Sequence, residues 1–318
     1  MSGLANFRNL SRLLTALALG LLVWLLYTAD LWEMVRDLDS SALVLVAAGS
    51  LGLTGAWFSL AAAWSVLVHR LAEAPQLSRR RHGGIYARTQ IQKYLPGNVF
   101  HFLLRHLEAR RQGEADEPLF WACVGELLGQ VISAGIVAAL ALSLFLTPAH
   151  GLMLFGALLA VILLIVVGLR LLEKVLPLAL RVLVRVVGKR GQQWYEGIDL
   201  KKVRLSSRDI AVILPLQGIY VVVMGLVAWG LSFAVEPFSV ELIFYVTGVT
   251  ALAWIVGFIL PGAPGGLGPR EAILASALAG VSSVETALFV ALALRVCSIL
   301  SDLLFYGVGV LAGLVKEG

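Results

Sequence analysis

The stretch LPGAPGGLGPRE, Leu260–Glu271, places three prolines and four glycines between two apolar segments and ends in two adjacent charges. Proline removes a backbone donor and clashes with the preceding turn, and glycine weakens a helix further, so a helix running from Ile243 must end near Leu260. The backbone groups freed by such a break cannot face lipid. They are tolerated at membrane depth inside protein or beside a wet cavity, where broken helices mark substrate sites. The alternative is a surface turn between two complete spans.

A second break of the same kind lies nearer the other end of the chain. KYLPGN, Lys93–Asn98, repeats the Leu-Pro-Gly triplet between two short segments with helical character. An arginine follows in both cases, Arg105 after the first triplet and Arg270 after the second. Two interrupted segments in corresponding halves are the pattern that points to a transporter binding site.

Composition sets the class of protein. Hydrophobic residues make up 59% of the chain and charged residues 14%, and the mean hydropathy is +0.89. These values predict an all-α polytopic membrane protein, with about six transmembrane helices at about 20 residues each. The expected spans cover residues 13–28, 42–68, 119–146, 152–169, 210–233 and 286–314. Two re-entrant broken helices, at 84–111 and 240–281, complete the pattern. The alternatives are a surface helix for the first and a complete span at 240–260 within the second.

The order of these elements predicts a single membrane domain, 1–318, built as an inverted repeat. The first repeat covers 1–147 and enters from inside; the second covers 148–318 and enters from outside. Arginines before the first span predict a cytoplasmic N-terminus. The segment 170–208 is the most basic part of the chain and is expected to face the cytoplasm. It predicts contact with anionic inner-leaflet lipids, or it marks topology alone.

Ionisable groups at bilayer depth are costly, so each suggests a functional site with a partner. The candidates are Glu126, Arg270, Glu271, Arg295 and Asp302. Arg295 and Asp302 lie on one helical face but about 10 Å apart, so each needs a partner on another element. If these acids and arginines face one cavity, they could hold a phosphate, which the forked donors of arginine would bind. The alternative is buried interhelical pairing, such as Arg295 with Glu126 or Glu271 with an arginine.

Catalytic signatures are absent from the sequence. The glycine-rich stretch lacks the Gly-Lys-Ser/Thr ending of a phosphate loop, and neither His-Glu-x-x-His nor Gly-x-Ser-x-Gly occurs. His101 and His106 flank Arg105 and could act on a lipid phosphate, but without metal-ligand spacing they fit polar anchors better. We therefore expect no catalytic residue, metal, cofactor or nucleic-acid partner.

With both glycine-proline motifs in view, the chain resembles the lysylphosphatidylglycerol synthase transmembrane family, the flippase-like membrane half of multiple peptide resistance factor proteins. The resemblance covers nearly the whole chain and rests chiefly on Gly-Gly-Leu-Gly followed closely by Arg-Glu. It implies a lipid flippase-type fold with re-entrant helices and a lipid-accessible cavity. It also implies a set of site positions: Pro96, Gly97, Gly265, Gly266, Gly268, Arg270 and Glu271. Synthase-type members continue into a soluble aminoacyl-transferase domain, whereas this sequence stops at Gly318, so we do not expect it to aminoacylate lipid.

The charge pattern and this resemblance together lead us to expect a multi-pass transporter of the bacterial inner membrane that moves an anionic lipid or lipid-linked sugar between leaflets. A phospholipid, a glycolipid and a polyprenyl phosphate all fit. Arg270 and Arg295, then Arg105, are expected to contact the phosphate. Glu126, Glu271 and Asp302 are expected to balance charge or couple protons. The rival is an enzyme or accessory subunit of a lipid-linked glycan, hopanoid or phospholipid-modification pathway. Homo-oligomerisation is left open.

Overall fold

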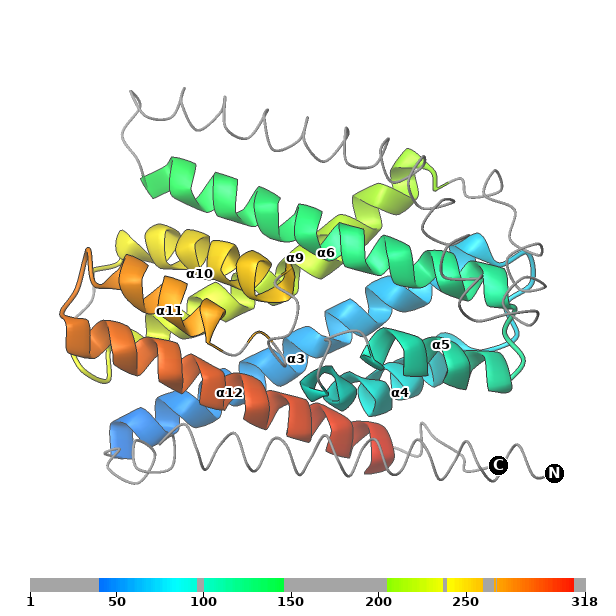
Figure 1. Ribbon diagram of the computed structural model, residues 1–318, viewed down its shortest axis with the longest axis horizontal. Helices are drawn as coiled ribbons and strands as arrows, with labels where there is room; N and C mark the ends of the chain where they lie inside the picture. Colours follow the sequence, from blue (N-terminus) through cyan, green and yellow to red (C-terminus); the bar gives the residue numbers. More distant parts are fainter. Residues whose placement is uncertain are drawn as a thin grey trace, which may run out of the picture.

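The computed structural model describes residues 40–95, 100–145, 205–236, 239–259, 266 and 268–311, and every regular element within these ranges is helical (Figure 1). The five long helices are α3 (Ser40–Leu71), α6 (Asp116–Phe145), α9 (Ser207–Ser232), α10 (Leu242–Ile259) and α12 (Val284–Leu311). Each is long and apolar enough to cross a membrane. The predicted all-α, multi-pass class is therefore confirmed. The expected spans at 13–28 and 152–169, and most of the basic segment 170–208, lie outside the described residues.

The first predicted break separates two antiparallel helices. Helix α4 (Arg79–Gln90) continues into the short 3₁₀ helix η1 (Ile91–Tyr94), and α5 (Phe100–Arg111) runs back along α4. Arg88 on α4 donates to Glu108 on α5 across 2.7 Å. At the end of the pair away from the break, Glu114 after α5 accepts from the backbone N–H of Leu77 before α4 at 2.8 Å.

The second break separates α10 from α11 (Pro269–Leu278). At the open end of the pair, the Tyr245 hydroxyl donates to the Ala277 carbonyl at 2.9 Å. At the closed end, a Cβ on Gly266 would lie 3.0 Å from the Gly257 carbonyl oxygen, so the two backbones touch where Gly266 has a φ of +75°. Since α11 returns to the end from which α10 set out, the pair has hairpin topology. Its re-entry into a membrane stays a prediction.

The two hairpins enter the helix bundle from opposite ends. Helices α3 and α9 run antiparallel, and Arg70 at the end of α3 pairs with Asp209 at the start of α9 across 2.9 Å. The first hairpin begins beside this end. The second opens at the other end, where Glu236 after α9 accepts from the Ser283 N–H just before α12. This opposed placement is the geometry that an inverted repeat would produce, although the repeat itself remains a prediction.

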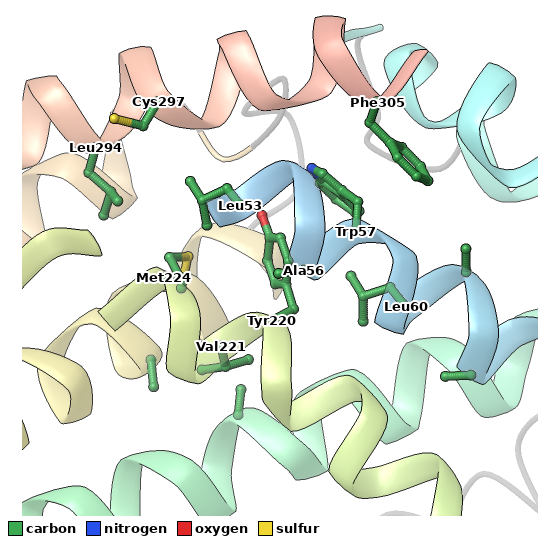
Figure 2. Packing of buried hydrophobic residues seen from close by; sticks show 14 of the residues in the cluster. Leu53, Ala56, Trp57, Leu60, Tyr220, Val221, Met224, Leu294, Cys297 and Phe305 are labelled. Atoms are coloured by element: carbon green, nitrogen blue, oxygen red, sulfur yellow. The ribbon is translucent and has the colours of Figure 1, made fainter. Parts of the chain in front are cut away.

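The core lies where α3 packs between α9 and α12 (Figure 2). Figure 2 shows Trp57 of α3 lying between Tyr220 of α9 and Phe305 of α12; the ring centroids are 4.6 and 6.0 Å from Trp57. Small residues allow the helices to approach closely: a Cβ on Gly225 of α9 would lie 2.6 Å from the Cα of Thr247 on α10. These contacts hold α3, α9 and α12 as a frame around the hairpin tips.

Candidate functional site

Residues beside the two breaks, Lys93 and Tyr94 in the first hairpin and Gly266 and Arg270 in the second, line a partly open cavity of about 60 Å³. We call it the cavity between the hairpin tips. Residues from α3, α6, α9 and α12 complete its walls. The lining consists of Trp57, Leu60, Tyr86, Gln90, Lys93, Tyr94, His101, Gln130, Tyr220, Trp254, Gly257, Phe258, Gly266, Arg270, Arg295 and Ser298. Aromatic walls with a few convergent polar groups are typical of a ligand site. Three cations, from η1, α11 and α12, share this small space.

Arg270 comes from the first turn of α11, just after the second break. Pro269 supplies the fixed φ that suits a helix start, and Glu271 accepts from the Gly268 N–H at 2.7 Å, which caps the helix. The Arg270 side chain is therefore fixed at the break and is only 7% exposed. Its Nη2 lies 2.9 Å from the Met224 sulfur, and no carboxylate of the described residues lies within 4.0 Å of its guanidinium.

Arg295 and Asp302 lie on the face of α12 that meets the two hairpins. Arg295 Nη1 is 3.5 Å from Glu271 Oε1 of the second hairpin. Asp302 accepts from Lys93 Nζ at 2.9 Å and from the Tyr94 hydroxyl at 2.5 Å, both from the first hairpin. The prediction that these two residues find separate partners on other elements is confirmed. Among the described residues, an ion pair thus links each hairpin to α12.

Lys93 and Tyr94 were not among the predicted site residues, although both belong to the KYLPGN motif. Lys93 Nζ also lies 4.5 Å from the centroid of the Trp57 ring, a cation–π contact. The position of Lys93 could have identified it: a lysine just before a helix break in a membrane protein lies inside the protein when the break does.

Arg105 and Glu126 form a separate buried pair, Nη1 to Oε2. Neither residue lines the cavity. Arg105 is fully buried, donates to Gln90 Oε1 at 2.8 Å, and lies 3.5 Å from the centroid of the Tyr86 ring. Glu126 also accepts from the Tyr86 hydroxyl at 2.7 Å and from Gln130 at 3.1 Å. The suggested pairing of Glu126 with Arg295 is replaced by this one, because α5 brings Arg105 against α6.

The two histidines that flank Arg105 differ in how they meet the cavity. His101, on α5, is 4% exposed and lines the cavity, and within the part of the chain that the structure describes its Nδ1 has no hydrogen-bond partner. His106 faces away and pairs with Asp116 at 3.0 Å. Gly266 lines the cavity, whereas Gly268 serves as the N-cap of α11. Pro96, Gly97 and Gly265 lie outside the described residues.

Taken together, the long apolar helices and the two hairpins closing on a cationic cavity define a multi-pass membrane protein. A family model for the lysylphosphatidylglycerol synthase transmembrane region matches residues 11–305, so the chain belongs to that family. The suspected family is thereby confirmed. A search of individual curated proteins gave no match.

Proposed function

We propose that this chain moves an anionic lipid or lipid-linked sugar between the leaflets of the membrane, with the headgroup phosphate held in the cavity between the hairpin tips. Membership of a lipid-related membrane family supports a lipid substrate. What carries the proposal is the charge of the site. Lys93, Arg270 and Arg295 bring three positive charges, and Asp302 and Glu271 supply two negative ones.

Among the residues that the structure describes, the cavity therefore holds one more cation than anion, and Arg270 is the cation without a carboxylate within 4.0 Å. An uncompensated charge in a low-dielectric site costs several kcal/mol, so the site gains if an anion enters. Arginine presents forked donors that match phosphate oxygens, and His101 Nδ1 offers one further hydrogen-bonding position. Arg270 is accordingly the primary phosphate contact, and Arg295 and Lys93 lie on the same cavity.

The cavity volume fits a small anionic group rather than a whole lipid, so a lipid would enter only as the hairpin tips separate. Ion pairs link each hairpin to α12: Lys93–Asp302 for the first and Glu271–Arg295 for the second. A phosphate between the tips would compete for the cations of these pairs. Binding and loosening of the tips are thereby coupled through charge.

The test is identification of the lipids that remain bound to the purified protein, by native mass spectrometry. Wild type is compared with Arg270→Ala, with the charge-retaining Arg270→Lys, and with Arg208→Ala as a control for loss of an exposed arginine. We expect a phosphate-bearing anionic lipid on wild type and Arg208→Ala, its loss from Arg270→Ala, and partial retention by Arg270→Lys. The same lipids on all four proteins would make Arg270 a structural charge and favour the accessory-subunit alternative.

A further inference from the structure

A second, larger cavity lies at the end of the bundle where the first hairpin enters. It has a volume of about 380 Å³, is open on one side and is lined by α3, α4 and α12. We call it the α3–α4–α12 groove. Its lining residues are Phe58, Ala61, Ala62, Ser65, Val66, Arg79, Arg80, Gly83, Ala87, Phe305 and Gly309. None of them lines the cavity between the hairpin tips, so the groove is a separate feature.

Small residues create the groove. Alanines and a glycine leave the space between α3 and α4 without large side chains, and the floor is closed by α12. A Cβ on Gly309 would lie only 2.6 Å from the Cβ of Ala87, so α12 and α4 touch there. At the inner end, Phe58 and Phe305 meet edge to face with ring centroids 5.1 Å apart. The walls are therefore almost entirely apolar.

The mouth of the groove is basic. Arg79 and Arg80 form the first turn of α4, which Ser78 caps by accepting from the Arg81 N–H at 3.4 Å. Both arginines are exposed, and none of the described residues that line the groove is acidic. The α3 residues that line the groove run from Phe58 to Val66, eight residues apart, so this wall is about 12 Å long at 1.5 Å per residue. That length is comparable with one half of a hydrocarbon core about 30 Å thick.

We propose that the α3–α4–α12 groove is a binding site for an anionic phospholipid, with the phosphate at Arg79 and Arg80 and an acyl chain along the apolar walls. Charge and shape both favour this occupant. Two arginines suit a phosphate, and an apolar groove on membrane-spanning helices is filled by an acyl chain at no cost in buried polar groups. The inference is independent of the transport proposal, because it uses none of the same residues.

The experiment uses the full chain in nanodiscs with a phosphatidylglycerol probe that carries a photoreactive group in its acyl chain. A phosphatidylcholine probe of the same chain length is the comparison. After illumination, the labelled peptides are identified by mass spectrometry. We expect phosphatidylglycerol to label the segment 58–66 of α3, and phosphatidylcholine to label it several-fold less.

Two variants test the two parts of the site. Arg79→Ala/Arg80→Ala should reduce labelling about tenfold, since each arginine near an anionic lipid contributes to binding. The matched control, Arg81→Ala/Arg208→Ala, removes the same charge from exposed positions off the groove and should label as wild type. Ala62→Trp should block the groove and abolish labelling, whereas Leu51→Trp, on an exposed part of α3 outside it, should not.

Three outcomes would overturn the inference. The first is equal labelling by the two lipids, and the second is equal labelling of the two double-arginine variants. The third is a photo-cross-link, from a photoreactive residue placed at position 62, to another segment of this chain instead of to lipid. Labelling that survives Arg270→Ala would show that the groove is filled whether or not the transport proposal holds.

Discussion

Removal of either partner of the buried pair Arg105–Glu126 should strongly destabilise this fold, which allows a quantitative prediction. Arg105 is fully buried and Glu126 is 1% exposed. Besides the carboxylate, the guanidinium contacts Thr89 at 3.4 Å and Gln90 at 2.8 Å. Nothing on the described residues could replace either charge if its partner were removed. Loss of one partner from such a pair costs about 3–5 kcal/mol, because the other is left buried and uncompensated.

The perturbation is a double-mutant cycle with Arg105→Met, Glu126→Gln and the combined variant. Each single substitution should lower the free energy of unfolding by about 3–5 kcal/mol. The combined variant should be less destabilised than the sum of the two, by about 2 kcal/mol, since it leaves no unpaired charge. The amide that Glu126→Gln introduces could still accept from the Tyr86 hydroxyl in that variant.

The assay is equilibrium unfolding in mixed detergent and sodium dodecyl sulfate micelles, followed by tryptophan fluorescence. Single variants that cost less than about 1 kcal/mol, the typical cost of any point mutation, would refute the reasoning. Strict additivity of the two substitutions would refute it as well, because residues in one ion pair must couple.

Three further predictions follow from single contacts. Gly225→Ala should destabilise the protein by about 1–3 kcal/mol, because the added Cβ would overlap the backbone of α10. The control Gly230→Ala, with nothing within 4 Å of its added Cβ, should be neutral or stabilising. Equal effects of the two substitutions in an unfolding assay would contradict this prediction. His82 lies outside the five candidate spans. Burial lowers its pKa to about 4, although the nearby Glu114 carboxylate acts in the opposite direction. In the unfolded chain His82 takes up a proton near pH 6.5, so its contribution to stability should be complete above that pH and fall as the pH drops toward 4. Between pH 6.5 and 4 the melting temperature of wild type should therefore fall more steeply with pH than that of His82→Gln. Parallel slopes would contradict this prediction. Tyr94→Phe should cost about 1.5–3 kcal/mol in the same unfolding assay, because it removes a 2.5 Å hydrogen bond to the Asp302 carboxylate, and a change near zero would show that Lys93 satisfies this carboxylate alone.

The sequence was informative where one residue type dictates backbone behaviour. A single proline need not end a helix, since Pro215 lies inside α9. Three prolines and four glycines within twelve residues do end one, so the end of α10 at Ile259 and the start of α11 at Pro269 could be predicted from the motif itself. The long apolar runs likewise predicted α3, α6, α9 and α12. These features depend on neighbours along the chain, which a sequence displays directly.

Partner choice could not be predicted in the same way. Glu126 could have met any arginine, and only the packing of α5 against α6 selects Arg105. Lys93 looks like an ordinary flanking charge until η1 carries it to Asp302, 209 positions later in the chain. Charge pairing across such separations depends on how the helices cross, so the sequence could identify most of the charged residues of the site but not their partners.

The most direct test of lipid movement through the cationic cavity is a leaflet-exchange assay in proteoliposomes. Fluorescent phosphatidylglycerol is the probe, an impermeant quencher reports the outer leaflet, and wild type is compared with Arg270→Ala and Arg208→Ala. The account predicts that wild type and Arg208→Ala exchange the probe at similar rates and that Arg270→Ala is about tenfold slower or worse, the loss expected for one charge-assisted contact. Equal rates for wild type and Arg270→Ala would contradict it.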